Sequence, residues 1–165
     1  MINKQAELKK LESGIRTILV AIDFSYCSRL AFRKAVELLK GKNGQIIALH
    51  VIDGDFVKSC VQHRLSKENK IKKELFIEAN KKLQHFLRQE KMNEIRVDAM
   101  VCEGVPFMEI NRKAMEVHAE TIVVGSCGNT GDMKTIFFGS TAEKILRFIT
   151  RPVLCVPPET EYCID

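Results

Sequence analysis

The chain has 165 residues, of which 45% are hydrophobic and 28% charged, and this composition is typical of one soluble globular domain and excludes a disordered chain. Its 26 Lys and Arg against 21 Asp and Glu give a formal net charge of +5, but much of the lysine excess alternates with glutamate, as on solvated helix faces. This pattern argues against a nucleic-acid partner, and apolar runs no longer than a strand argue against a membrane span.

The N-terminal third of the chain begins with a polar, lysine-rich lead-in, residues 1–14, before a domain that we place at 15–158. Within this domain the continuous apolar run 17–22 predicts a strand that is buried on both faces. Ser25 follows at a position suited to cap a helix whose apolar residues recur at helical spacing. The next apolar run, 46–52, predicts the second strand.

The rest of the chain continues the same alternation. Residues 53–67 are expected to form a longer, less regular connection, because Asp, Gly and Asp open it. Apolar residues at helical spacing then predict three more helices, and apolar runs predict three more strands. In chain order these are a helix over 67–90, a strand over 95–102, a helix that begins after Pro106, a strand over 121–124, a helix with apolar residues from 142 to 149, and a strand over 152–156. Residues 159–165 form a C-terminal tail.

This alternation of strands and helices predicts an α/β fold, an open five-stranded parallel sheet with helices on both faces and right-handed crossovers. In such sheets ligands lie beyond the carboxyl ends of the strands, where the winding reverses. Asp23, Val51 and the loop that begins at Gly125 all lie at strand ends, so we expect them to face one crevice if the first strand is central. Asp23 has a second interpretation, because aspartates after strands often stabilise the following turn.

A glycine-spaced loop follows the fourth predicted strand, and Gly139-Ser140-Thr141 opens the last predicted helix. Gly125 and Gly128 carry no Cβ and tolerate positive φ, so their backbone can approach an anion closely. Ser140 and Thr141 add hydroxyl donors at a helix N-terminus, where unpaired amides and the helix dipole favour negative charge. Each segment alone is typical of ordinary turns and helix caps, but together they predict a phosphate site.

Other well-known motifs are absent from the sequence. It contains neither G-x-x-x-x-G-K-[ST] nor a G-x-G-x-x-G after the first strand, which argues against a P-loop NTPase and a nicotinamide-dinucleotide fold. The four histidines lack the spacing of metal ligands, and no Ser, His and acidic set carries a nucleophile signature. The sequence therefore predicts no protein metal site and no dedicated acyl-transfer catalysis.

The six cysteines, at 27, 60, 102, 127, 155 and 163, form no C-x-x-C pair, and several lie inside apolar runs. With no secretory segment at the start, they predict reduced, mostly structural thiols in a cytoplasmic protein. Cys127 lies in the amide-rich loop, where a thiolate is favoured. A loop residue without a redox role is nevertheless the interpretation that we prefer for it.

Read in order from about Arg16 to Pro157, the chain resembles the universal stress protein family. The run 18–25, Ile-Leu-Val-Ala-Ile-Asp-Phe-Ser, is similar to the opening strand and turn of that family, and Leu49-His-Val51 is similar to its second strand. Gly104-x-Pro106 is similar to the entry to its third helix. The nucleotide-binding branch has the signature Gly-x2-Gly-x9-Gly-[Ser/Thr], and this chain has Gly-x2-Gly-x10-Gly-Ser over 125–140.

The resemblance implies a Rossmann-like adenine nucleotide α-hydrolase-like fold with strand order 3-2-1-4-5 and a homodimer formed through the last strand. It also implies that ATP or AMP binds in the crevice, with Mg²⁺ accompanying a triphosphate. Asp23 would bind the ribose and Val51 would contact adenine through its backbone. The residues implied to hold the phosphates are Gly125, Gly128, Gly139, Ser140 and Thr141.

One departure from the family signature bears on the length of the phosphate chain. Ten residues, rather than nine, separate Gly128 from Gly139, and the extra residue lies near Asp132. An inward-pointing Asp132 would repel a γ-phosphate, so the sequence predicts that triphosphate fits less well than monophosphate.

Three functions are compatible with these motifs. The first, which we favour, is a dimeric nucleotide-binding sensor or regulator of a stress response, in which bound nucleotide changes the order of the phosphate loop. The second is a slow ATP-hydrolysing enzyme, for which Lys134 is the nearest candidate cation although the sequence identifies no general base. The third is a ligand-free dimeric interaction module in which the extra residue has abolished the phosphate site.

Overall fold

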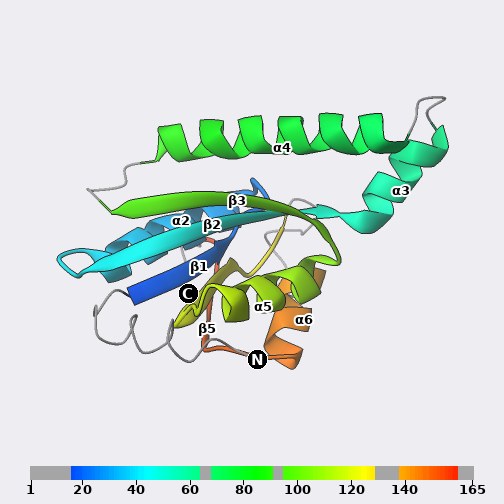
Figure 1. The fold of residues 1–165 in the computed structure, drawn as a ribbon. Coiled ribbons are helices and arrows are strands. Elements are labelled where there is room, and N and C mark those ends of the chain that lie inside the picture. Colours follow the sequence, from blue (N-terminus) through cyan, green and yellow to red (C-terminus); the bar gives the residue numbers. More distant parts are fainter. Residues whose placement is uncertain (1–15, 64–67, 91–94, 129–137, 160–165) are drawn as a thin grey trace.

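In the computed structural model, residues 16–63, 68–90, 95–128 and 138–159 are described, and they contain one five-stranded sheet of order β3-β2-β1-β4-β5 (Figure 1). The strands are β1 (Arg16–Ala21), β2 (Gly44–Asp53), β3 (Arg96–Gly104), β4 (Thr121–Gly125) and β5 (Val153–Val156). Every neighbouring pair of strands runs parallel. This confirms the predicted fold class and strand order, including the central position of β1.

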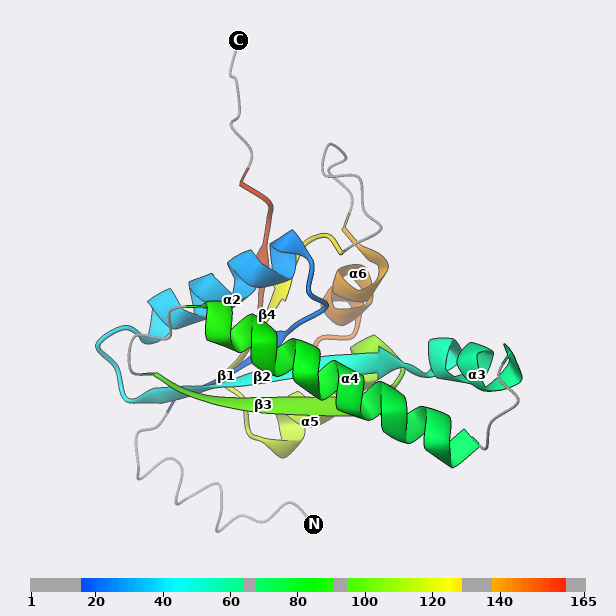
Figure 2. The same cartoon turned by 90° about the horizontal axis from the view of Figure 1, so that it is seen from above.

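Helices cover both faces of the sheet, as Figures 1 and 2 show from two directions. On one face lie α2 (Tyr26–Leu39) and α4 (Glu68–Gln89), and on the other lie α5 (Pro106–Glu116) and α6 (Ser140–Arg147). Among the described helices, none is long and apolar enough to cross a bilayer.

The central strand contributes to the core on both of its faces, as the continuous apolar run 17–22 predicts. Val20 packs with Phe32 in the cluster under α2 and α4, whereas Leu19 packs with Ile110 and Ile145 in the cluster under α5 and α6. Both strand side chains are fully excluded from solvent. Because successive side chains of a strand point to opposite faces, an apolar residue at every position is what burial of both faces requires.

Helix α2 begins where the sequence predicts it. Ser25 is its N-cap, with φ of −70° and ψ of 165°, and its side-chain oxygen accepts a hydrogen bond from the backbone N–H of Ser28 at 3.1 Å. This bond satisfies one of the first-turn amides that the helix itself leaves unpaired. The cap fixes the direction in which the chain leaves β1, and thereby places the turn at Asp23 that precedes it.

The connection predicted as irregular over 53–67 contains a helix, α3 (Gly54–His63), so that prediction is wrong for most of its length. The polar residues interpreted as a turn stabilise the first turn of the helix instead, since a carboxylate oxygen of Asp53 accepts from the backbone N–H of Asp55 at 2.8 Å. Val57 is 2% exposed and packs with the end of β2 and with α4. Tertiary packing therefore decides the structure of a segment whose helical pattern is short.

Candidate functional site

A cleft of about 810 Å³ lies at the carboxyl ends of β1, β2 and β4. This volume is in the range of small-molecule sites. The cleft is lined by every site residue named in the sequence analysis: Asp23, Val51, Gly125, Gly128, Gly139, Ser140 and Thr141. The winding of the sheet reverses between β1 and β4, and the cleft lies beside this point. Sheets of this kind bind their ligands at such a reversal.

The two glycine segments lie against each other at the base of the cleft. The backbone N–H of Gly139 donates to the carbonyl oxygen of Ser126 at 2.7 Å, so the start of α6 is hydrogen-bonded to the loop after β4. A Cβ added to Gly139 would lie 3.3 Å from the backbone nitrogen of Gly128, and one added to Gly128 would lie 2.9 Å from a carboxylate oxygen of Asp23. Side chains on these glycines would therefore fill the space between the two segments and Asp23.

The reason for glycine at these positions differs in part from the one that the sequence suggests. Positive φ angles occur at Gly41 and Gly104 among the described glycines, but not at Gly125, Gly128 or Gly139. At the site, the absence of a Cβ is what matters. The conformational freedom of glycine plays no part in the described segment of this loop.

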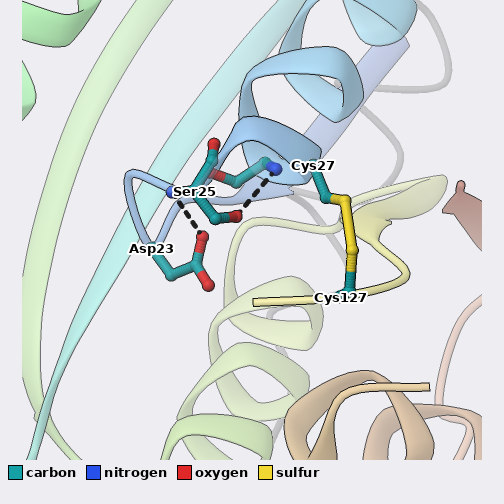
Figure 3. Close-up of a disulfide and its surroundings, with 5 residues drawn as sticks. Asp23, Ser25, Cys27 and Cys127 are labelled. Carbon is teal, nitrogen blue, oxygen red and sulfur yellow. Dashed lines mark hydrogen bonds between the residues drawn. A yellow bond between two sulfur atoms is a disulfide. The ribbon is translucent and has the colours of Figure 1, made fainter. Parts of the chain in front are cut away.

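Asp23 stabilises the turn between β1 and α2 and also lines the cleft. One carboxylate oxygen accepts a hydrogen bond from the backbone N–H of Ser25 at 3.0 Å, which is the local role that the sequence left open (Figure 3). The other oxygen, Oδ2, is the atom that a Cβ on Gly128 would approach. The turn holds the carboxylate at an exposed position beside Gly128, in the loop after β4.

The start of α6 departs from the expectation for Ser140 and Thr141. The N-cap is Gly139, with φ of −60° and ψ of 151°, so the two hydroxyl residues are the first two residues inside the helix. Neither side chain is the cap of this helix. By helix geometry the first-turn amides have no carbonyl partner within α6, and the cap residue has no side chain to pair with them.

Val51 lies past the last contact between β1 and β2. Ile22 donates its backbone N–H to the Leu49 carbonyl at 2.8 Å, and the chain then turns away into the Asp23 turn. Alternate residues of a strand direct their backbone groups to the same side, so those of Val51 point toward the side that β1 has left. The half-buried Val51 side chain packs on the cluster under α5 and α6, which is the core role that the residue type suggests.

Sequence reasoning missed Phe56, which lines the cleft from α3 with 55% of its surface exposed. The signal was present, because Phe56, Val57, Cys60 and Val61 repeat at helical spacing. Interpreting 53–67 as an irregular connection removed this segment from consideration.

Cys27 and Cys127 are joined by a disulfide (Figure 3). Their Cα atoms are 6.0 Å apart, and both residues are buried. The prediction of reduced thiols is therefore wrong for this pair. Because β1 and β4 are neighbours in the sheet, their following loops meet although the two cysteines are 100 residues apart in sequence. Among the other described cysteines, Cys60, Cys102 and Cys155 are free.

A half-buried histidine lies beside the Asp23 turn, on the face covered by α2 and α4. The Nδ1–H of His50 donates to the Ile22 carbonyl at 2.7 Å, and its ring centroid is 4.5 Å from that of Phe24. Burial lowers the pKa of His50, with a further lowering by Lys82. The hydrogen bond to Ile22 and the charge of Asp23 oppose that shift without cancelling it.

Because the pKa of His50 is lowered in the folded chain, we expect acid to destabilise the fold. The pKa of His50 is lower in the folded than in the unfolded chain, so the unfolded chain binds the proton more readily and the free energy of unfolding falls as pH drops through about 6.5. Urea unfolding of the wild type at about pH 8 and about pH 5.5 measures the loss, and a His50→Gln variant should lose less over the same interval. His85→Gln, at an exposed position on α4, is the matched control and should behave as the wild type. An equal pH dependence for His50→Gln and the wild type would contradict the assignment.

The described residues contain no group of three or more His, Cys, Asp or Glu side chains arranged to hold a metal ion. Asp132 and Lys134, which the sequence analysis connects with the γ-phosphate and with hydrolysis, lie outside the described residues, as do the lead-in 1–14 and most of the C-terminal tail.

Comparisons with known proteins agree with this architecture. The model of the universal stress protein family matches residues 14–157. Universal stress protein MJ0577 of Methanocaldococcus jannaschii is 29% identical over 155 residues, which cover 86% of this chain and 94% of that protein. Universal stress protein MJ0531 of the same organism is 30% identical over 149 residues, 88% of this chain and 84% of its own length.

Solved structures give the same result. The structure of MJ0577 superposes with a TM-score of 0.76 at 29% identity, covering 88% of this chain and 97% of that one. A universal stress protein from Archaeoglobus fulgidus, solved in complex with dAMP, has the same fold, with a TM-score of 0.57 and 22% identity over 86% of this chain and 97% of its own.

Proposed function

The chain belongs to the universal stress protein family, and from this premise we propose that its cleft binds an adenine nucleotide, ATP or AMP. We further propose that the protein acts as a dimeric sensor or regulator in a stress response. The observation that carries the proposal is the convergence of Gly128, the start of α6 and Asp23 on one cleft. The dAMP complex of the relative from A. fulgidus supports the choice of an adenine nucleotide.

The phosphates would bind where the glycine loop meets α6. The amide of Gly139 already donates to Ser126, so the amides that remain for an anion are those of the first turn of α6, together with the hydroxyls of Ser140 and Thr141. Gly125, Gly128 and Gly139 would contribute no charge, but without a Cβ they would let a phosphate group come close to the backbone. Mg²⁺ accompanying a triphosphate would take its ligands largely from phosphate oxygens and water.

The adenosine half would occupy the side of the cleft between β1 and α3. The carboxylate of Asp23, whose Oδ2 lies beside Gly128, would accept a hydrogen bond from a ribose hydroxyl. The backbone groups of Val51, past the end of β1, would pair with the adenine edge. The exposed ring of Phe56 offers an aromatic face for the base, a contact that the sequence analysis did not assign.

We propose binding rather than dedicated catalysis, with slow ATP hydrolysis as the alternative function. Phosphoryl transfer relies on cationic groups to stabilise the developing charge, and Lys134, the nearest candidate cation, lies outside the described residues. In the function that we favour, nucleotide binding shifts the population of conformations of the loop after β4, and a partner protein recognises the result in a homodimer formed through β5, the edge strand beside β4.

Calorimetric titration with ATP, ADP and AMP tests the proposal, with a Gly128→Val variant as its sharpest form. A valine side chain at 128 would occupy the space beside Asp23, since its Cβ alone would lie 2.9 Å from Oδ2. We expect the affinity to fall by at least about 30-fold, equivalent to about 2 kcal/mol.

Gly54→Ala is the matched control. A Cβ at position 54 would contact only backbone atoms of Gly104, none closer than 3.7 Å, so we expect this variant to bind nucleotide as the wild type does. Absence of heat with all three nucleotides in the wild type would sink the proposed function. Tight binding retained in Gly128→Val would show that the loop after β4 is not part of the nucleotide site.

A further inference from the structure

The Cys27–Cys127 disulfide joins the two segments that form the proposed nucleotide site. Cys27 is the second residue of α2 and follows directly on the turn of Asp23 and Ser25. Cys127 stands immediately before Gly128 and itself lines the cleft. Figure 3 shows the disulfide beside this turn, linking the start of α2 to the loop after β4.

Hydrogen bonds in the described part of the loop attach it to other elements. The Ser126 N–H donates to the Val156 carbonyl at 2.8 Å, and the Ser126 carbonyl accepts from Gly139 at 2.7 Å. These contacts connect the loop to β5 and α6. The disulfide is the covalent connection to α2, and it fixes the residue next to Gly128 against the helix that follows Asp23.

We propose that Cys27 and Cys127 form a reversible redox site that sets the affinity of the cleft for nucleotide, with the disulfide form binding more tightly than the dithiol form. This regulation rests on the nucleotide binding proposed above. The physical reason is pre-organisation: a ligand that must order a loop loses part of its binding free energy to that ordering, and a crosslink that has already ordered the loop removes this loss.

In the disulfide form the residues of the proposed site line one cleft. The cleft of about 810 Å³ is open in it, and Gly128 lies beside Asp23. The dithiol form loses the crosslink to α2, so Gly128 is free to separate from the Asp23 turn. We expect a coupling of about tenfold in affinity between the two forms, within the usual range for linked sites.

The redox step balances with a peroxide as oxidant and a dithiol as reductant. Cys127, which lines the cleft, attacks one peroxide oxygen. A sulfur–oxygen bond forms, the oxygen–oxygen bond breaks, and the departing hydroxide takes a proton to become water. Cys27, 1% exposed, then attacks the Cys127 sulfur, so that the disulfide forms and the second oxygen leaves as water. A small dithiol reverses the step by thiol–disulfide exchange and is itself oxidised to a disulfide.

The proposal also predicts the reverse coupling. If oxidation favours nucleotide binding, bound nucleotide must favour the disulfide to the same extent. A nucleotide in the cleft would in addition cover Cys127, the member of the pair that a reductant reaches from the cleft. Saturating ATP or AMP should therefore shift the redox equilibrium of the pair toward the disulfide and slow its reduction.

The experiment compares the full-length protein after treatment with hydrogen peroxide and after treatment with dithiothreitol. Alkylation and mass spectrometry of the peptides that contain Cys27 and Cys127 establish the redox state, and calorimetry with AMP and ATP gives the affinity of each form. We expect the reduced form and a Cys127→Ser variant to bind about tenfold more weakly than the oxidised wild type. Cys60→Ser, at a free cysteine of α3, should retain the full redox response.

The outcomes separate the two proposals. Equal affinity of the verified oxidised and reduced forms overturns the redox site and leaves the nucleotide function standing. No binding by either form overturns both. Peptides that remain fully alkylated after peroxide treatment overturn the redox site whatever the affinities are. Because Cys127→Ser could lower affinity by misfolding, chemical reduction of the wild type is the decisive arm, and circular dichroism of both forms must remain that of the folded chain.

Discussion

Reduction of the Cys27–Cys127 disulfide is expected to lower the free energy of unfolding by about 4 kcal/mol. The bond joins residues 100 positions apart, so it restricts most of the unfolded chain, and in the chain-entropy account a loop of this length gives a stabilisation near the top of the usual range. Guanidinium unfolding of the oxidised protein, with and without dithiothreitol, measures the difference as a shift of the midpoint.

Two variants control this measurement. The double variant Cys27→Ser/Cys127→Ser should unfold at the same denaturant concentration with and without reductant. Cys60→Ser should lose as much stability on reduction as the wild type, since Cys60 is a free cysteine. A loss below about 1 kcal/mol on reduction of the wild type would show that the crosslink adds little to the packing already present between α2 and β4.

Gly125→Ala is expected to destabilise the fold by about 3 kcal/mol, the upper part of the range for overpacking in a closely packed interior. A Cβ at position 125 would lie 2.6 Å from the carbonyl carbon of Cys27 and 2.7 Å from its Cβ. Backbone cannot rotate away as the tip of a side chain can, so the first turn of α2 would have to separate from the end of β4. Because Gly125 lines the cleft, the proposed nucleotide affinity should fall together with stability.

The neighbouring Gly128 supplies the contrast that identifies the cause. A Cβ there meets the tip of the Asp23 side chain, which can turn aside, so Gly128→Ala should retain more stability than Gly125→Ala. Gly54→Ala, with contacts no closer than 3.7 Å, should stay within about 1 kcal/mol of the wild type. Thermal unfolding of the three variants ranks them. Equal losses for Gly125→Ala and Gly54→Ala would contradict the proposed contact with Cys27.

These two expectations concern the same junction, the place where the loop after β4 meets the first turn of α2. Gly125 permits the backbone contact, the disulfide fixes it, and Gly128 then lies beside Asp23. The proposed nucleotide affinity, the stability of the fold and the redox state of the chain are therefore linked through a few residues. Measuring all three quantities on one set of variants would show how strongly they are coupled.

Much of the fold follows from the sequence, because periodicity is a local property. The continuous apolar run of β1 requires burial on both faces, and the structure places it at the centre of the sheet. Ser25 caps α2 as its residue type and position predict. The helix α3 escaped prediction because its pattern is short and its opening Asp-Gly-Asp is equally typical of a turn.

The site divides in the same way. The spacing of glycines after β4 and before α6, with Asp23 after β1, is written in the sequence, and regular alternation of strands and helices brings those loops to one edge of the sheet. The absence of C-x-x-C said nothing about Cys27 and Cys127, since their pairing depends on two strands being neighbours. The sequence also does not show at which glycine a Cβ would clash, or with which atom, because these clashes depend on contacts between distant segments. The sequence alone determined the five strands, the helices other than α3, and their order along the chain. The tertiary structure decided that residues 54–63 are helical and which ends of the elements touch, because contact is a property of distance in space and not along the chain.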